Sequence, residues 1–233
     1  MKRIAVTQSN YLPWKGYFDT IASVDEVVLL DRVQYTRRDW RNRNLIKTRA
    51  GLRWITVPVR SKGCYRQAID ETIVDGHAWI AQHLAAVRHA YARAAAFSEE
   101  FPWLEALLRS APGNTISSLN RALIEGVCAR LGIVTKIRDA REFNLPDDRN
   151  ERLLAICAQA GAAEYVSGPT AKAYLDADLF ARRGVRIRWK SYARYPPYKQ
   201  PHPPFEHRVS IVDTLMCTGS AACRVIRSAA AFE

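Results

Sequence analysis

The sequence lacks the features of a membrane-spanning or secreted protein. No apolar stretch reaches the roughly 18 residues that a membrane-spanning helix needs, and no repeat or low-complexity tract occurs. The basic start of the chain has the charge of a secretion signal, but Asn10, Lys15 and Asp19 interrupt any apolar region behind it. We therefore expect a cytoplasmic protein without a membrane span.

Cysteine is scarce, and its spacing carries no metal signature. The 233 residues include five cysteines, an odd number, with no C-x-x-C pair and no zinc-type spacing. Unpaired thiols in a reducing compartment are the expectation, and no metal site is predicted.

Acidic residues are too few to balance the basic ones. The chain has 35 lysines and arginines against 23 acidic residues, a formal net charge of +12. This excess favours an anionic partner, such as a nucleic acid, a nucleotide, an acidic carrier or a membrane surface. A genome that is rich in arginine and alanine codons produces the same excess without any partner, so both interpretations stay open.

The composition is that of a globular protein, with 48% hydrophobic and 25% charged residues. Apolar runs predict buried strands at 3–7 and 26–30, and a helix at 16–23 between them completes a βαβ unit. Residues 54–59 predict a further strand, whereas residues 31–53 form a polar, arginine-rich segment.

Helical spacing then dominates residues 76–131, and the alternation of strands and helices resumes after residue 132. We predict an α/β fold, a mainly parallel Rossmann-like sheet with a helical insertion. The chain is expected to be one domain over 1–233, with its α/β core at about 1–75 and 132–233.

The first candidate site is the loop that follows the first predicted strand. Ligands of open α/β sheets bind at the carboxyl ends of the strands. Amide side chains at this edge can read a polar group, and a glycine at the helix start lets an anion approach the backbone. A polar turn that only caps the helix is the alternative. The candidate residues are Gln8, Asn10, Tyr11, Trp14 and Gly16.

A second candidate, Asp31 with Gln34, leaves the next strand at the same edge. Asp31 is a candidate general base or amine anchor, whose pKa burial would raise towards a useful value. Pairing of Asp31 with a nearby arginine is the alternative.

Basic and aromatic residues alternate between Arg32 and Arg53. This segment holds eight basic residues and one acid, and Arg43 and Asn44 lie in it beside Trp40. Basic side chains can bind phosphates and aromatic side chains can stack on a ring, so the combination suits a nucleotide, a nucleotide sugar, a tRNA end or a phosphopantetheine carrier. A solvated loop is the alternative.

A second strand–turn–helix pattern follows at Ser167, Gly168, Thr170 and Lys172. It predicts another anion cradle by the same physics, although the Walker pattern G-x-x-x-x-G-K-[ST] is absent. A capped turn explains it equally simply.

Near the end of the chain, His202 and Cys217 are the ingredients of a thiol–imidazole pair for acyl transfer. The sequence does not show that the two side chains meet.

Several long motifs follow one another in a characteristic order. They are TQSNYLPWKGYF, LLDRVQYTRRDWRNRNLIKT, WITVPV, ERLLAICAQAGAAEYVSGPTAKAYLD and FxxxxSIVDTLMCTG. In them the chain resembles the WbqC-like protein family along essentially its whole length. Family members usually read His-Gln-Pro-Asn-Tyr in the first motif, where this chain has Thr7 for the histidine and Ser9 for the proline.

The resemblance implies an enzyme of surface-polysaccharide (such as O-antigen) or natural-product biosynthesis that modifies a sugar or transfers an acyl or aminoacyl group. Our leading hypothesis is transfer from a phosphate-bearing donor (carrier protein, tRNA or CoA) to an amine of an amino sugar or small metabolite. Asp31 would act on the amine, the first loop and Gln34 would position the acceptor, and Arg43, Lys172 and the 167–170 turn would hold donor phosphates.

Two alternatives remain. The first strand, loop and Val33-Gln34-Tyr35 are distantly similar to the HIGH-type nucleotidylyltransferases, which implies a nucleotide as bound group. Both histidines of their His-x-Gly-His motif are missing, so Lys15 and Lys172 would supply the cations. The other alternative is a non-enzymatic basic module that binds RNA or an acidic carrier protein. The enzymatic hypothesis requires the segments near Gln8 and Ser167 to line one cavity together with Asp31.

Overall fold

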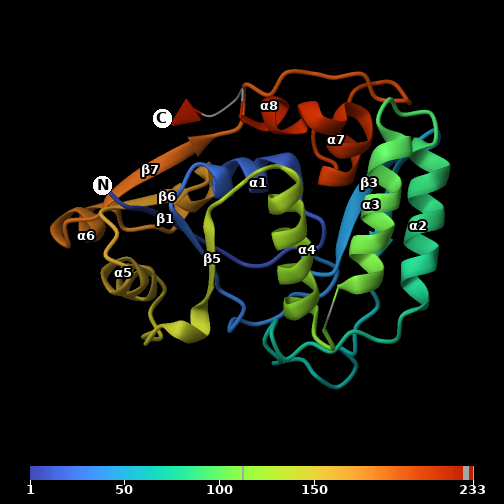
Figure 1. The fold of residues 1–233 in the computed structure, drawn as a ribbon. Helices are drawn as coiled ribbons and strands as arrows, with labels where there is room; N and C mark the ends of the chain where they lie inside the picture. Colours follow the sequence, from blue (N-terminus) through green and yellow to red (C-terminus); the bar gives the residue numbers. More distant parts are fainter. Residues whose placement is uncertain (112, 228–230, 233) are drawn as a thin grey trace.

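A six-stranded sheet forms the centre of the molecule (Figure 1). The structure is a computed structural model that describes residues 1–111, 113–227 and 231–232. The strand order is β5-β2-β1-β6-β7-β8, in which the first five strands are parallel and β8 is antiparallel to β7. The strands are Arg3–Thr7 (β1), Glu26–Leu29 (β2), Lys136–Asp139 (β5), Glu164–Ser167 (β6), Arg186–Ser191 (β7) and Ala231–Phe232 (β8). The predicted α/β fold with a mainly parallel, Rossmann-like sheet is confirmed.

Helices cover both faces of this sheet. They are Lys15–Ala22 (α1), Ala78–Tyr91 (α2), Phe97–Ser110 (α3), Ile116–Arg130 (α4), Arg149–Gln159 (α5), Ala177–Arg182 (α6), Ile211–Thr218 (α7) and Ala222–Arg227 (α8), with 3-10 turns at Ala140–Glu142, Pro169–Ala173 and Gly219–Ala221. None of the described helices has the length and apolar character to cross a membrane.

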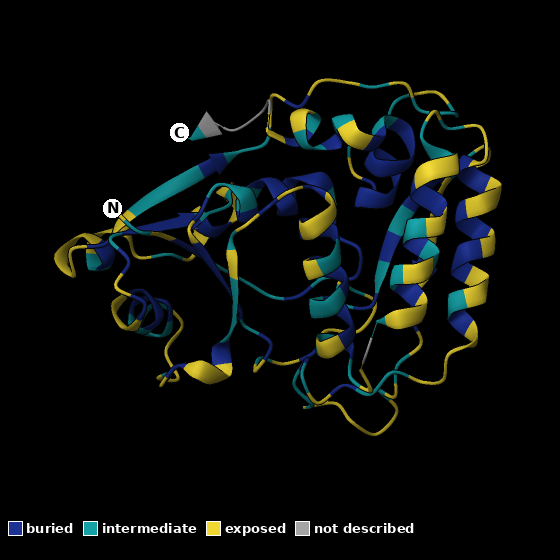
Figure 2. Cartoon of the chain, viewed as in Figure 1, coloured by how far each residue is buried: buried dark blue, intermediate teal, exposed yellow. Residues whose placement is uncertain are grey.

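Alternation along the central strands divides the core into two layers, because neighbouring strand residues point to opposite faces. Ile4 and Val28 pack against α5 and α6 on one face. Ala5 and Val27 pack against α1, α7 and the second half of α4 on the other face. The central strands are therefore buried on both sides, as Figure 2 shows.

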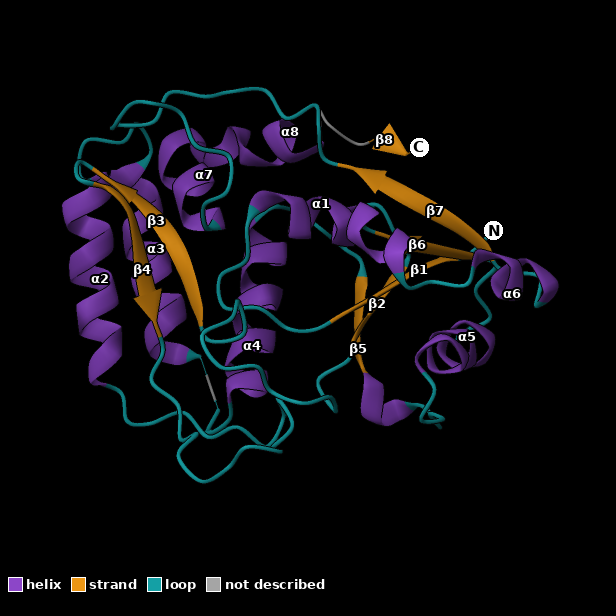
Figure 3. Cartoon of the chain, turned by 180° about the vertical axis from the view of Figure 1, so that it is seen from behind, coloured by secondary structure: helices purple, strands orange, loops and turns teal. Residues whose placement is uncertain are grey.

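A separate hairpin lies beside the helices and carries a third apolar cluster. Its strands are Arg43–Thr48 (β3) and Gly51–Thr56 (β4), and α2 lies along it (Figure 3). The sequence predicted no strand in the polar segment 31–53, where β3 and the start of β4 lie, and the strand predicted at 54–59 overlaps β4 only at residues 54–56. Ile46 and Ile55 are 0% and 3% exposed and face the core, although polar residues such as Lys47 and Thr56 stand directly beside them in the sequence.

The α4 helix connects the hairpin cluster to the sheet. Ile116 and Leu119 in its first half belong to the cluster around the hairpin, α2 and α3. Val127 and Cys128 in its second half belong to the cluster that covers the sheet. The segment predicted as a helical insertion therefore contributes to two apolar clusters.

An ion pair is buried between α1 and the sheet. Lys190 Nζ lies 2.9 Å from Asp19 Oδ1, and their side chains are 0% and 1% exposed. Tyr195 donates its hydroxyl to the other oxygen of Asp19 at 2.6 Å. The pair thereby fixes β7 and the loop behind it onto α1.

We predict that Lys190→Ala lowers the free energy of unfolding by about 3–5 kcal/mol, because it leaves the Asp19 carboxylate buried without its cation. Denaturant unfolding measures this loss. The control is Arg183→Ala, which breaks the exposed pair with Glu151 and should cost less than about 1 kcal/mol. Equal losses in the two variants would contradict the assigned importance of the buried pair.

Candidate functional site

The topology provides a crevice between the carboxyl ends of β1 and β6. From β1 the chain passes to β2 on one side, whereas β6 pairs with β1 on the other side. The loops that leave β1 and β6 consequently diverge, and open α/β sheets bind ligands at such a switch point. A cavity of about 350 Å³ lies there. It is lined by Ala5, Val6, Thr7, Trp14, Tyr17, Thr20, Ile21, Val27, Val166, Ser167, Gly168, Pro169, Thr170 and Tyr192.

Two segments that are far apart in the sequence form opposite walls of this cavity. Thr7 and Trp14 come from β1 and the loop behind it, and Ser167, Gly168 and Thr170 come from the turn after β6. The two candidate segments therefore share one hollow, with hydroxyl groups in both walls.

Trp14 occupies the space beside Gly16. A Cβ atom on Gly16 would lie 2.3 Å from the indole of Trp14. The indole also meets the ring of Tyr192 edge-on at 5.2 Å between centroids. Gly16 was predicted to let an anion approach, but its missing side chain instead admits this aromatic wall.

Tyr17 closes the inner end of the cavity next to Gln8. Its hydroxyl donates to the Gln8 carbonyl oxygen at 3.1 Å. Burial raises the pKa of Tyr17 far above its usual range, so the hydroxyl stays protonated. The Gln8 side chain is half-buried beside the cavity but is not part of its lining.

Among the described residues that line the cavity there is no acid, histidine, lysine or arginine. Lys172 follows the same turn but is exposed, with its Nζ 5.6 Å from the centre of the Trp189 ring. Among the described residues no cluster of histidine, cysteine or acidic side chains is placed to hold a metal. The cavity is thus a neutral, hydroxyl-lined and aromatic-walled site.

Asp31 does not line the cavity. One of its carboxylate oxygens accepts the backbone N–H of Ser9 at 2.8 Å, and the other accepts the hydroxyl of Ser117 on α4 at 2.5 Å. The residue is 5% exposed. Asp31 therefore holds the first loop against α4, and the predicted role as a base finds no geometric support.

Tyr11 is likewise fully buried behind the loop rather than exposed to a ligand. Its hydroxyl lies 2.9 Å from Nδ1 of His83, whose Nε2 donates to the Thr56 carbonyl oxygen at 3.1 Å. Burial lowers the pKa of His83 to about 4, so the ring is neutral and Nδ1 accepts from Tyr11. Tyr11, predicted to contact the substrate as part of the first loop, therefore gains no support as a catalytic or positioning residue from this geometry.

The amides predicted to bind a substrate hold the backbone of the loop. Asn44 donates its Nδ2 to the carbonyl oxygens of Tyr11 and Leu12, at 3.1 and 2.9 Å. Leu12 adopts a left-handed backbone with φ of 39°, and these bonds help to compensate for its strain. Asn10 accepts a short hydrogen bond from Arg41. The Asn44 amide and the oxygen of the Asn10 amide are therefore already occupied within the protein.

Gln34 and Arg43 lie away from the cavity. Gln34 is exposed and donates to the carbonyl oxygen of Tyr65 at 2.9 Å, at the edge of a different hollow. The guanidinium of Arg43 stacks 3.9 Å from the ring centre of Trp54 on the hairpin. Neither residue lines the hollow between β1 and β6.

His202 and Cys217 have separate environments. His202 Nε2 donates to the Ala90 carbonyl oxygen at 3.1 Å. The Cys217 thiol belongs to the apolar cluster around α2 and α3, and burial and the Asp213 carboxylate raise its pKa. A raised pKa opposes thiolate formation, so the predicted pair gains no support.

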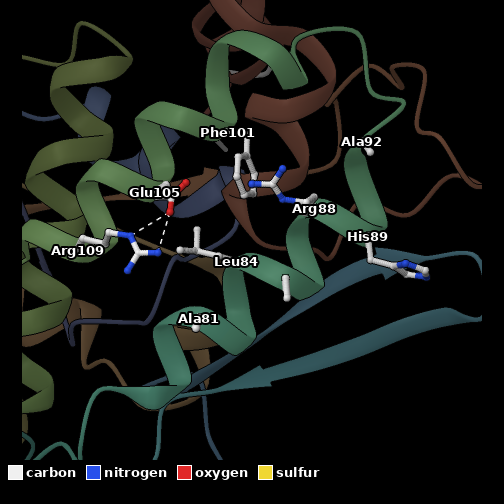
Figure 4. A pocket seen from close by; sticks show the side chains of 9 residues that line it. Ala81, Leu84, Arg88, His89, Ala92, Phe101, Glu105 and Arg109 are labelled. Carbon is white, nitrogen blue, oxygen red and sulfur yellow. Dashed lines mark hydrogen bonds and ion pairs between the residues drawn. The ribbon is translucent and has the colours of Figure 1, made fainter.

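A larger hollow of about 630 Å³ lies between α2 and α3 (Figure 4). Its floor is apolar, with Leu84 and Phe101, and Arg88 stacks on Phe101 at 4.5 Å. Arg109 donates twice to Glu105 across one end. Because these charges are satisfied within the groove and no polar groups converge, the cavity between β1 and β6 is the better candidate.

The comparison with known proteins agrees with the motifs in the sequence. The sequence profile of the WbqC-like protein family matches residues 8–225. The chain belongs to the WbqC-like protein family. It is similar to the "Uncharacterized protein Rv1507c" of Mycobacterium tuberculosis (strain ATCC 25618 / H37Rv), with 46% identity over 227 residues that cover 97% of this chain and 98% of the relative. No solved structure matches the chain.

Sequence reasoning named Lys15 only as a cation for a bound nucleotide and missed that this WbqC-like chain buries it. Lys15 is 1% exposed, and its Nζ donates to the His207 carbonyl oxygen at 3.2 Å. The rings of Tyr195, Tyr198 and Phe205 surround that nitrogen at 5.4 to 5.7 Å. The aromatic residues of segment 192–207 were the sequence feature that could have indicated a buried cation, since cations favour aromatic faces.

Asp213 is the carboxylate that faces this lysine. It accepts hydrogen bonds from Tyr91 at 2.9 Å, Tyr198 at 2.7 Å and Gln200 at 2.8 Å. Burial raises the pKa of Asp213, whereas burial lowers the pKa of Lys15 to about 8. The aspartate and its partners tie α7 to α2 and to the loop over Lys15.

Gly16→Ala is predicted to lower the free energy of unfolding by about 1–3 kcal/mol, because the new methyl group collides with the Trp14 indole. In the Trp14→Leu background the same change should cost clearly less, since the colliding ring is gone. Denaturant unfolding of the four proteins gives the coupling. Additive losses would contradict the proposed contact.

Lys15→Met is predicted to change the pH dependence of stability. Because the folded pKa of Lys15 is about 8 and its usual value is 10.5, the folded state releases this proton first. The unfolding free energy of the wild type should then rise relative to that of Lys15→Met as pH increases from 8 to 10.5. Urea unfolding between pH 7 and 10.5 measures it. The exposed Lys136→Met provides the control, and parallel wild-type and Lys15→Met curves would refute the shift.

Proposed function

We propose that this WbqC-like protein is a transferase that moves an acyl or aminoacyl group from a phosphate-bearing donor to an amine of an amino sugar or small metabolite. The reacting ends meet in the cavity between β1 and β6. The amine nitrogen attacks the donor carbonyl carbon, the carbonyl–sulfur or carbonyl–oxygen bond breaks, and the leaving group takes up the proton that the amine loses.

The observation that carries this proposal is the lining of the cavity. Hydroxyl groups of Thr7, Ser167 and Thr170 suit hydrogen bonds to a sugar or a phosphate, and Trp14 and Tyr192 offer flat apolar surfaces to a ring. A volume of about 350 Å³ suits one such moiety.

The neutral wall favours transfer from an activated donor. A thioester or aminoacyl ester already carries its leaving group, so correct positioning of the two reactants supplies much of the acceleration. Nucleotidyl transfer instead develops charge on a triphosphate that needs cations, and the residues that the structure describes in the cavity wall include no lysine or arginine. The transferase hypothesis is therefore preferred to the nucleotidylyltransferase alternative.

The catalytic roles are revised accordingly. Asp31 becomes a positioning residue, because both of its oxygens hold the first loop in place. Ser167 and Thr170 replace it as the proposed contacts to the substrates, and Trp14 orients the ring of the acceptor.

Mass spectrometry of reaction mixtures tests the proposal. Three donors (an acyl-CoA, an aminoacyl-tRNA and an acyl-loaded carrier protein) are each incubated with amino-sugar acceptors and the wild-type protein. We expect an N-acylated product with one donor class. Absence of product with all three donors would refute the transferase proposal.

Ser167→Ala is predicted to lower kcat/KM roughly ten-fold with the productive donor, because it removes a hydrogen bond to substrate. Ser98→Ala, at an exposed position of α3, is the matched control and should leave kcat/KM unchanged. If Ser167→Ala behaved like this control, the cavity would not be the reaction site.

A further inference from the structure

Two tryptophans lie side by side on the surface of the hairpin region. Trp40 and Trp54 are 41% and 40% exposed, and their ring centroids are 5.2 Å apart. Arg43 stacks its guanidinium on Trp54 at 3.9 Å. We name Trp40, Arg43 and Trp54 the indole platform. None of its residues lines the cavity between β1 and β6.

The chain around Trp40 carries more basic than acidic residues. Asp39 is the single acid between Arg32 and Arg53. It accepts the backbone N–H of Trp40 at 2.7 Å and lies 3.4 Å from Arg41. Among the interactions of the described residues, no carboxylate pairs with the exposed Arg37 or Arg38. Surface arginines without acidic neighbours suit an anionic partner.

Arg43 carries an unmet hydrogen-bond donor. Its Nε atom is buried and has no hydrogen-bond partner within the described part of the chain. A buried donor without an acceptor is costly. Because this atom has almost no accessible surface, a partner's oxygen would reach it only after the guanidinium moves, so the phosphate contacts of Arg43 are assigned to the rest of its guanidinium.

We propose that the indole platform binds single-stranded nucleic acid, with bases stacked on Trp40 and Trp54 and phosphates neutralised by Arg37, Arg38 and Arg43. Stacking of bases on aromatic faces beside basic side chains is the usual mode of such binding. The surface extends the protein's function beyond the transferase cavity and does not depend on that proposal.

An acidic protein surface is the competing partner, and the platform fits it less well. Carboxylates need the cations but gain little from two adjacent exposed indole faces. Nucleobases use both features, because every base has a flat face and every linkage a phosphate. The indole pair therefore favours a nucleic acid strand.

Fluorescence anisotropy with a labelled 12-nucleotide oligouridylate tests the inference. Trp40→Leu and Trp54→Leu should each raise Kd roughly ten-fold, while the salt dependence of binding stays unchanged because no phosphate contact is lost. Arg37→Gln should flatten the salt dependence. The matched control is Tyr174→Leu, which removes an exposed ring (47%) that also carries a stacked arginine, Arg149.

Circular dichroism and thermal unfolding verify that each variant is folded. Trp54→Phe keeps an aromatic face for stacking, so it should bind with most of the affinity that Trp54→Leu loses. An RNA duplex of equal length should bind more weakly, since its base faces are covered. Unchanged affinity in both tryptophan variants, equal binding of the duplex, or stronger competition by polyglutamate than by unlabelled oligouridylate would each overturn the inference. These outcomes concern RNA binding alone and leave the transferase assay independent.

Discussion

Buried charge is the constraint on which the arrangement around α1 depends. The side chains of Asp19 and Lys190 are withdrawn from water and satisfy each other, with Tyr195 as a further donor. Lys15, one helical turn earlier, lies within aromatic rings opposite Asp213. An unpaired ion is very costly in the interior. The segment after β7 passes over α1, where Tyr195 donates to Asp19 and the rings of Tyr195 and Tyr198 lie beside the Lys15 nitrogen.

That path also builds the candidate site. The segment fixed by Tyr195 places Tyr192 against Trp14, and Trp14 reaches this position only because Gly16 has no side chain. The aromatic wall of the cavity, formed by Trp14 and Tyr192, thus results from the packing of the segment after β7 on α1. The opposite wall follows from the parallel pairing of β1 with β6, which brings the turn at Ser167 to the same edge of the sheet.

The sequence predicted the parts of the site that follow from strand order. Apolar runs marked β1, β2 and β6, so the loops behind them were expected at one edge, and Ser167 and Thr7 do lie there. It missed β3, where polar residues such as Asn44 and Lys47 stand beside Leu45 and Ile46, and it found only residues 54–56 of β4. It also failed for polar loop residues such as Asp31 and Asn44, because spacing does not reveal whether an amide or carboxylate faces a ligand or the carbonyl and N–H groups of its own loop.

The position of α4 couples the two halves of the molecule mechanically. One end of this helix is embedded with the hairpin and α2, and the other end with the sheet. Pulling the hairpin layer away would strip apolar cover from the first half of a helix whose second half stays packed on the sheet. A displacement of the hairpin layer would therefore act on the sheet through this one helix, which is packed into both clusters.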